Sequence, residues 1–168
     1  DAEITTVKSA ERAMGVDGII YNKANPFNGT FMPLALVNKI GVIKPEMFIW
    51  GDEEEYLTRA RKYDLSIATN VKAKFYHPAS KSKFETYFFN FLKITTKPKH
   101  LEMNYYRNRA YLAKKYGRFG GLISVPRTFL VTLLYFLCKR KAGDTIRFVR
   151  YFVDGMLDVY KLPPITPK

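Results

Sequence analysis

The sequence predicts an α/β first part, residues 1–80, followed by an all-helical second part, residues 81–168. Before residue 80, short extended segments alternate with short helical patterns and with clusters of turn-forming residues. After residue 80, the chain is rich in aromatic and basic residues, and its apolar residues recur at helical spacing. The two parts therefore differ both in composition and in the spacing at which apolar residues recur.

The first part contains short elements separated by glycines. In chain order these are a strand at 19–21, a helix within 31–40 that ends at Gly41, a helix that begins at Asp52, and extended segments at 65–68 and 71–76. Asp52 is a suitable N-cap for the second helix, because its carboxylate can accept hydrogen bonds from the free first-turn amides.

The second part contains longer apolar patterns. We expect helices at 80–93, at 101–116 with Gly117 as the stop, at 125–138 with Pro126 in its first turn, and from Asp144 to the Pro163-Pro164 pair. Helices with one apolar face and flanking lysines and arginines either pack onto a neighbouring domain or lie in a membrane interface. Both interpretations stay open for this part.

Composition limits the partners. Apolar residues make up 47% of the 168 residues, which is enough for one domain with a core and excludes a disordered chain. The net charge of +13 favours an anionic partner, such as nucleic acid, a phospholipid surface or a phosphorylated substrate. The single cysteine, Cys138, excludes an intrachain disulfide and a cysteine-based zinc site. The chain begins at Asp1 without an initiator methionine, and we expect a fragment of a longer protein.

Four consecutive acids, Asp52 to Glu55, form the most informative stretch. Adjacent like charges raise one another's pKa and weaken folding, although the helix dipole favours one or two acids at a helix N-terminus. Trp50-Gly51 stands directly before the acids, and His77 follows at the end of the next extended segment. The structural interpretation is helix capping. The functional interpretation is a carboxylate base at a strand-to-helix turn, with His77 at the same edge.

Further motifs accompany this stretch in a fixed order. They are Asn28-Gly29-Thr30-Phe31, Asn38-Lys39-Ile40-Gly41, the run FIWGDEEEY from Phe48 to Tyr56, and Phe75-Tyr76-His77-Pro78. This order resembles the second half of family 2 glycosyltransferases, in the branch that contains rhamnosyl- and galactofuranosyltransferases. Tyr105-Tyr106-Arg107-Asn108 also resembles the helix that follows in that branch, and the match covers roughly residues 15–115.

The resemblance implies a GT-A fold, of which this chain is similar to the C-terminal half: a short mixed sheet with helices, then a helical region. It implies an inverting transfer of a sugar from a nucleotide sugar to a lipid-linked or polysaccharide acceptor. The family's donor-binding half, with its Asp-x-Asp metal motif, is absent from this sequence. We therefore expect residues 1–80 to form the acceptor side of the cleft, and this chain alone to be inactive.

The resemblance also assigns roles to the acids and the histidine. Glu53 matches the base that takes the acceptor proton. The family usually has Asp at this position, so Asp52 remains a rival. His77 matches a ligand of a divalent metal, Mg²⁺ or Mn²⁺, which is expected only with the donor-binding half. Without the resemblance, we would interpret His77 as a structural residue at the end of a strand. Glu55 either binds within the protein or positions the acceptor.

Three further residues are candidates for substrate binding. Trp50 offers an apolar face on which a sugar ring can stack, or it is a core tryptophan. Gly29 either lets the backbone approach a ligand closely or serves a turn. Thr30 belongs to the same turn-rich segment.

Two non-catalytic functions remain open. One is a basic binding module for a membrane surface or nucleic acid, and the other is a scaffold whose acids only cap a helix. Nucleic acid is disfavoured, because the chain has no RNA-binding signature and the acid run repels a phosphate backbone.

An anionic membrane fits the helices at 126–161 better, and implies a peripheral position at the inner, cytoplasmic face of the membrane. The apolar surfaces around Leu130–Leu137 and Phe148–Leu157 would enter the interface. The basic residues expected to meet lipid phosphates are Lys139, Arg140, Lys141, Arg147 and Arg150.

Overall fold

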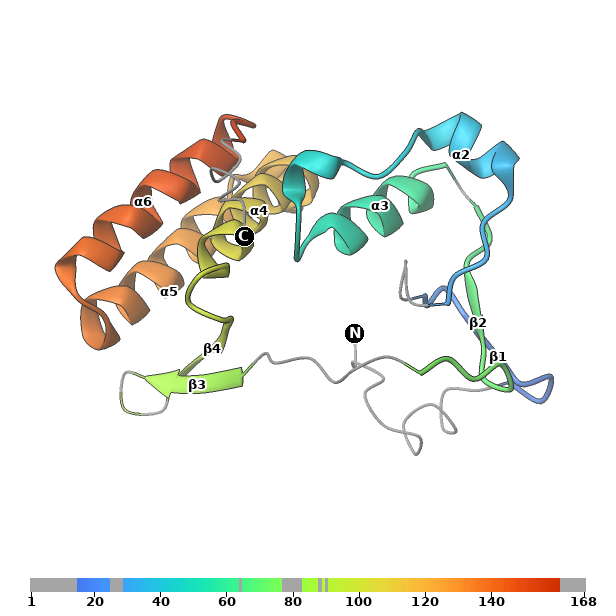
Figure 1. The fold of residues 1–168 in the computed structure, drawn as a ribbon, viewed down its shortest axis with the longest axis horizontal. Coiled ribbons are helices and arrows are strands. Elements are labelled where there is room, and N and C mark those ends of the chain that lie inside the picture. Colours follow the sequence, from blue (N-terminus) through green and yellow to red (C-terminus); the bar gives the residue numbers. More distant parts are fainter. Residues whose placement is uncertain are drawn as a thin grey trace, which may run out of the picture. The chain divides into compact units, whose positions relative to one another are not determined.

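A computed structural model of the chain describes residues 15–24, 29–63, 65–76, 83–87, 89 and 91–160 (Figure 1). The described residues form two compact units. The first unit holds those within 15–43 and 56–76, and the second holds those within 44–55 and 83–160. Helix α3, Asp52–Arg61, is continuous; its first turn belongs to the second unit and the rest to the first.

The first unit combines a small sheet with two short helices. Strands β1, Ile19–Tyr21, and β2, Ala68–Asn70, pair antiparallel, with Ile20 opposite Thr69. Helix α2, Leu34–Ile40, ends at Gly41, whose φ of 78° favours glycine. The Arg59 guanidinium donates hydrogen bonds to the Ile40 and Val42 carbonyls, at 2.6 and 2.9 Å, and so satisfies carbonyls at the end of this helix.

The core of this unit is small. Its buried members are Ile40, Tyr56 and Ala60, and the half-buried Met32, Leu36, Ile43, Leu65 and Ile67 pack against them. The predicted strand at 19–21 and the predicted helix before Gly41 are confirmed. The extended segments predicted at 65–68 and 71–76 are wrong in their bounds, because the paired strand is 68–70 and a turn follows it.

The second unit begins, after residue 80, with a β-hairpin and not with the predicted helix at 80–93. Strand β3, Lys83–Tyr87, pairs antiparallel with β4, Leu92–Thr96. Phenylalanine, tyrosine, threonine and isoleucine favour extended backbone. Ile94 and Thr96 are buried while Lys93 is exposed, which is the alternation of a strand with one covered face. Both sheets of the described chain are two-stranded and antiparallel, so the expected mixed sheet is also wrong.

Three helices complete the second unit: α4, Glu102–Tyr116, α5, Ser124–Lys139, and α6, Ala142–Met156. They lie side by side in Figure 1, with the short 3-10 helix η2, Arg118–Gly121, between α4 and α5. These helices confirm the helices predicted after residue 100, including Gly117 as the end of α4. The predicted bounds of the last helix are wrong, because α6 begins before Asp144, at Ala142, and ends at Met156. The predicted domain border at residue 80 stays a prediction; the compact units differ from it because residues 44–55 belong with the second unit.

Aromatic side chains fill the space among these helices. The rings of Phe136 and Phe148 stack with their centroids 4.9 Å apart, and Tyr106 meets both rings edge-on at 5.2 and 5.6 Å. Aromatic pairs in these geometries contribute about 0.5–1.5 kcal/mol each beyond the area they bury. Helix α4 is therefore held on the side that carries Tyr106 by α5 and α6.

Gly155 sets how closely α6 approaches α4. A Cβ atom at this position would overlap the backbone carbonyl oxygen of Arg107, and would lie 3.1 Å from the Cβ atom of Ala110. Because the nearest atom belongs to backbone, a side chain here cannot be relieved by a rotamer change.

We predict that Gly155→Ala lowers the free energy of unfolding by about 2 kcal/mol, within the usual cost of an overpacked core. Gly143→Ala is the matched control, since it lies in the same helix with no atom within 4 Å of its added Cβ. This control should be neutral or stabilising by up to about 1 kcal/mol. Urea denaturation measures both variants, and a Gly155→Ala protein as stable as the Gly143→Ala protein would contradict the close packing of α4 and α6.

Candidate functional site

The acids follow a loop with unusual backbone angles. The 3-10 helix η1, Pro45–Met47, ends there, and the φ angles of Phe48, Trp50 and Gly51 are 65°, 56° and 112°. Left-handed backbone at a non-glycine residue costs on the order of 1–3 kcal/mol, and it persists only where the surroundings impose it. The run before Gly51 is therefore a constrained loop, and the predicted strand-to-helix turn is wrong in its first half.

Asn108 of α4 imposes this loop conformation. Its side-chain amide nitrogen donates to the carbonyls of Met47, Ile49 and Trp50 at 2.9, 3.0 and 2.9 Å. Asn108 is fully buried. A primary amide has only two N–H bonds, so three acceptors must share them. The loop carbonyls that a strand would direct to a neighbouring strand are directed to this one side chain.

Arg107 holds the stretch just before the loop. Its guanidinium lies 3.3 Å from the carbonyl oxygens of both Glu46 and Met47, and its Nε donates to the Asn108 side-chain oxygen. Burial lowers the pKa of this guanidinium, and the nearby Tyr160 ring, 4.5 Å away, works against that shift. Lys44 forms an ion pair of 2.8 Å with Asp158, so residues 44–51 are fastened at several points within the second unit.

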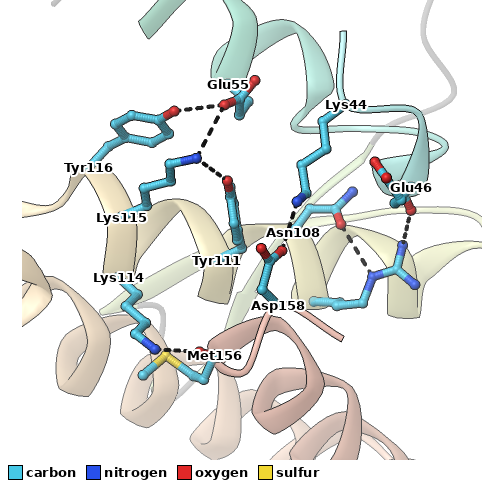
Figure 2. Close-up of polar contacts among 11 residues, drawn as sticks. Lys44, Glu46, Glu55, Asn108, Tyr111, Lys114, Lys115, Tyr116, Met156 and Asp158 are labelled. Atoms are coloured by element: carbon cyan, nitrogen blue, oxygen red, sulfur yellow. Dashed lines mark hydrogen bonds and ion pairs between the residues drawn. The ribbon is translucent and has the colours of Figure 1, made fainter. Parts of the chain in front are cut away.

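Glu55 points into the protein. Only 2% of it is exposed, and its carboxylate accepts a hydrogen bond of 2.7 Å from the Tyr116 hydroxyl, with the Lys115 ammonium 3.8 Å away (Figure 2). Its backbone N–H donates to the Gly51 carbonyl at 2.8 Å, which closes the first turn of α3. These contacts favour the internal role for Glu55 over a role in positioning the acceptor.

The other three acids lie in different surroundings. Glu54 is exposed and forms an ion pair of 2.9 Å with Arg109. Asp52 is half-buried, and among the described residues its Oδ1 atom is buried without a hydrogen-bond partner. Glu53 is half-buried, and its charge acts on Lys97. Asp52 and Glu53 are thus the two half-buried carboxylates that directly follow the loop.

Lys97 lies over the Trp50 ring. Its ammonium is 4.7 Å from the centroid of that ring and 5.3 Å from the centroid of Tyr105. Burial lowers the pKa of Lys97, and the negative charge of Glu53 opposes that shift. One part of the Trp50 surface is therefore covered by a cation, and a sugar ring would have to stack on the remainder.

The remaining predicted residues lie elsewhere. Gly29 and Thr30 belong to the first unit, where Gly29 has a φ of 69° and a Cβ would lie 2.7 Å from the Phe75 ring. This geometry explains the glycine by a turn and a close side chain. His77 lies outside the described residues. The structure thus places Trp50, Asp52 and Glu53 on one segment of the second unit.

A divalent metal has one suitable donor here. The buried, unpartnered Oδ1 of Asp52 is the kind of hard oxygen that Mg²⁺ and Mn²⁺ bind. Among the described residues, however, no three histidine, cysteine or acidic side chains cluster closely enough to hold an ion. By themselves, the described residues therefore do not make a complete metal site.

Comparison with known proteins shows similarity to a glycosyltransferase. The chain is 27% identical over 160 residues to the galactofuranosyltransferase GlfT1 of Mycolicibacterium smegmatis. The match covers 89% of this chain and 52% of that protein. The chain is a distant relative of a glycosyltransferase. It spans about half the length of the curated relative it matches. No family model matches the chain, and no solved structure does.

Sequence reasoning gave no role to the residues that support the loop. The segment Tyr105–Asn108 carried part of the family resemblance, but not the function of Arg107 and Asn108. The available signal was an arginine–asparagine pair among apolar residues in the middle of a helix, since buried polar side chains are almost always hydrogen-bonded. Lys97 gave no such signal, because it lies in a polar break between elements.

We predict that Asn108→Asp lowers the free energy of unfolding by about 3 kcal/mol, because it replaces a buried donor with an acceptor facing three carbonyls. Glu54→Gln is the control: it removes an exposed ion pair next to the same loop and should cost less than about 1 kcal/mol. Thermal unfolding compares the two. Equal, small losses would show that the loop does not depend on Asn108.

Proposed function

We propose that this chain supplies the acceptor side of an inverting glycosyltransferase of the GT-A type, family 2. Sequence similarity to a galactofuranosyltransferase supports a sugar-transfer function. The observation that carries the proposal is that the four acids have different contacts. Glu54 and Glu55 are turned to Arg109 and Tyr116, while Asp52 and Glu53 stand beside Trp50 at a rigidly held loop.

The proposed reaction needs one carboxylate as a base. As the acceptor hydroxyl oxygen attacks the anomeric carbon of the donor sugar, the base takes the hydroxyl proton and the nucleoside diphosphate leaves. The new carbon–oxygen bond forms on the face opposite the leaving group, so the configuration inverts. We assign the base to Glu53, whose longer side chain reaches further from the helix, and keep Asp52 as its rival.

The donor and acceptor that we propose are suggested by the name of the relative and by the family resemblance. The proposed donor is a nucleotide-activated sugar, with galactofuranose as the first candidate, and the proposed acceptor is lipid-linked or a polysaccharide. The donor is expected to be bound by residues outside this chain, which alone is expected to be inactive. A divalent metal, with His77 among its ligands, remains part of the proposal and would stabilise the leaving diphosphate when bound.

We predict that Glu53→Gln lowers kcat about a hundredfold or more in the full protein that carries this chain, the usual scale for loss of a general base. The loss should appear in kcat with little change in KM for the donor, because Glu53 acts on the acceptor. The assay is sugar transfer from a panel of nucleotide sugars that includes a galactofuranose donor.

The neighbouring acids supply the controls. Glu54→Gln should keep kcat within about threefold, since surface ion pairs contribute little. A large loss in Asp52→Asn with a near-normal Glu53→Gln would move the base to Asp52. Near-normal turnover in both variants would remove the proposed mechanism.

An anionic membrane is the partner we propose for α5 and α6. On α5, Leu130, Leu134 and Leu137 repeat at helical spacing and are 55%, 36% and 62% exposed. On α6, Ile146 and Val153 are exposed. Within the apolar surface expected around Phe148–Leu157, Phe148 and Phe152 are buried in the core and are not available to a membrane. Arg140 forms an ion pair of 2.9 Å with the buried Glu102 and is not among the lipid-facing cations.

The described helices fit a position on the membrane surface. None of them is long and apolar enough to cross a bilayer. Lys139, Lys141, Arg147 and Arg150 are exposed beside the apolar positions, and each contributes roughly 1 kcal/mol near an anionic surface. A non-enzymatic membrane-binding module is therefore the runner-up function.

We predict that the double change Leu134→Gln and Leu137→Gln weakens partitioning into phosphatidylglycerol vesicles roughly tenfold or more, since burying a leucine contributes about 1.5–3 kcal/mol. Val16→Gln with Val42→Gln, exposed positions of the first unit, is the control and should have no effect. Co-sedimentation with and without anionic lipid measures this. Equal binding by all proteins would make these leucines ordinary surface residues.

A further inference from the structure

A cavity of about 890 Å³ opens in the second unit. Its walls come from β4, from the first half of α4, and from the segment that includes η2 and the start of α5. This volume lies in the range of small-molecule sites. None of the residues named above as a catalytic candidate lines it.

The cavity wall is basic. The basic residues of the lining are Arg109, Arg118, Arg127 and Lys93, and none of the described lining residues is acidic. Arg109 is partly neutralised by Glu54, and Lys93 lies 4.2 Å from the Phe84 ring centroid. Neither Arg118 nor Arg127 forms an ion pair with another described residue. Several arginines around one hollow match the planar, bidentate contacts that phosphate groups accept.

Polar donors accompany these cations. The hydroxyls of Thr95, Ser124 and Thr128 belong to the lining residues. Helix α5 begins here, and among the described residues no side chain caps its N-terminus, so the positive end of the helix dipole adds to the charge of the arginines. The cavity thus combines charge with neutral donors, as phosphate sites do.

Apolar residues line the same cavity. Ile123, Val131 and Phe152 contribute to its wall, and Phe119 and Ile123 are 79% and 53% exposed. Leu122, the neighbour of Ile123 in the chain, is 76% exposed. A purely inorganic anion would leave this surface uncovered, whereas an anion joined to a hydrocarbon chain would cover it.

We propose that this cavity binds the terminal phosphate or diphosphate of an amphiphile that carries an apolar chain. Arg118 and Arg127 hold the phosphate, with Arg109 and Lys93 beside them, and the chain lies along Phe119, Leu122 and Ile123.

The cavity adjoins the candidate site through two residues that belong to both. Arg109 lines the cavity and pairs with Glu54 of the acid run, and Tyr105 lines it and shares the Lys97 ammonium with Trp50. Resting on the proposed function, the ligand is then a lipid-linked acceptor, anchored by its phosphate with its sugar end toward Glu53. The binding of the phosphate amphiphile itself does not depend on that function.

The test is direct binding to the full protein, by calorimetry, with geranyl diphosphate as the probe. Inorganic pyrophosphate and geraniol separate the anionic and apolar parts, and each should bind at least about tenfold more weakly than the intact probe. Dihexanoyl phosphatidylglycerol, below its micelle concentration, represents a membrane phosphodiester. Equal or tighter binding of this phospholipid would overturn the assignment to a terminal phosphate.

The variant is Arg118→Gln with Arg127→Gln, which should weaken geranyl diphosphate binding about tenfold or more, as expected for lost charge-assisted hydrogen bonds. Lys74→Gln with Lys83→Gln removes the same charge from two exposed positions outside the cavity and should leave the Kd within about twofold. Equal losses in both variants, or none in the arginine variant, would overturn the proposal. If the protein binds geranyl diphosphate as expected but has no transferase activity, the cavity remains a site for a phosphate amphiphile. Only the proposal that this ligand is a sugar acceptor is then rejected.

Discussion

The candidate site depends on the hydrogen bonds that the Asn108 side chain donates to the loop before α3. Its amide nitrogen donates to the carbonyls of Met47, Ile49 and Trp50. Asn108 lies on α4, and other residues of this helix are packed into the aromatic core. Gly51 fits this arrangement because a Cβ there would lie only 3.0 Å from the Asn108 Cβ atom. The unfavourable backbone angles of the loop are therefore balanced by buried hydrogen bonds.

This arrangement explains why four adjacent acids are tolerated. Each carboxylate at the start of α3 has different surroundings: an arginine for Glu54, a tyrosine and a lysine for Glu55, and the edge of the Trp50 loop for Asp52 and Glu53. These separate surroundings reduce the repulsion among the four charges, and the helix dipole favours the one or two acids nearest the N-terminus. The acids that remain at the loop carry the proposed chemistry, and the basic cavity beside them carries the proposed anchor for an anionic ligand.

Sequence reasoning succeeded where local patterns decide the structure. Gly41 and Gly117 marked helix ends correctly, and the apolar spacing after residue 100 located α4, α5 and α6. It failed at the β3–β4 hairpin, where residues that favour extended backbone were assigned to a helix. It also failed where a distant contact decides, at the loop that contains Trp50, which is held by a residue 58 positions away. For the same reason, the acid run was recognised as a candidate site, but the positions of Lys97 and Asn108 beside it were not.

We propose that Asn108, by holding the loop before α3, positions the carboxylate of Glu53 for catalysis. A double-mutant cycle on kcat, with Asn108→Ala, Glu53→Gln and the combined variant in the full protein, tests it most directly. If Asn108 works through Glu53, the combined variant will be scarcely slower than Glu53→Gln alone. If the two losses multiply, Asn108 and Glu53 act independently, and the account of the site is contradicted.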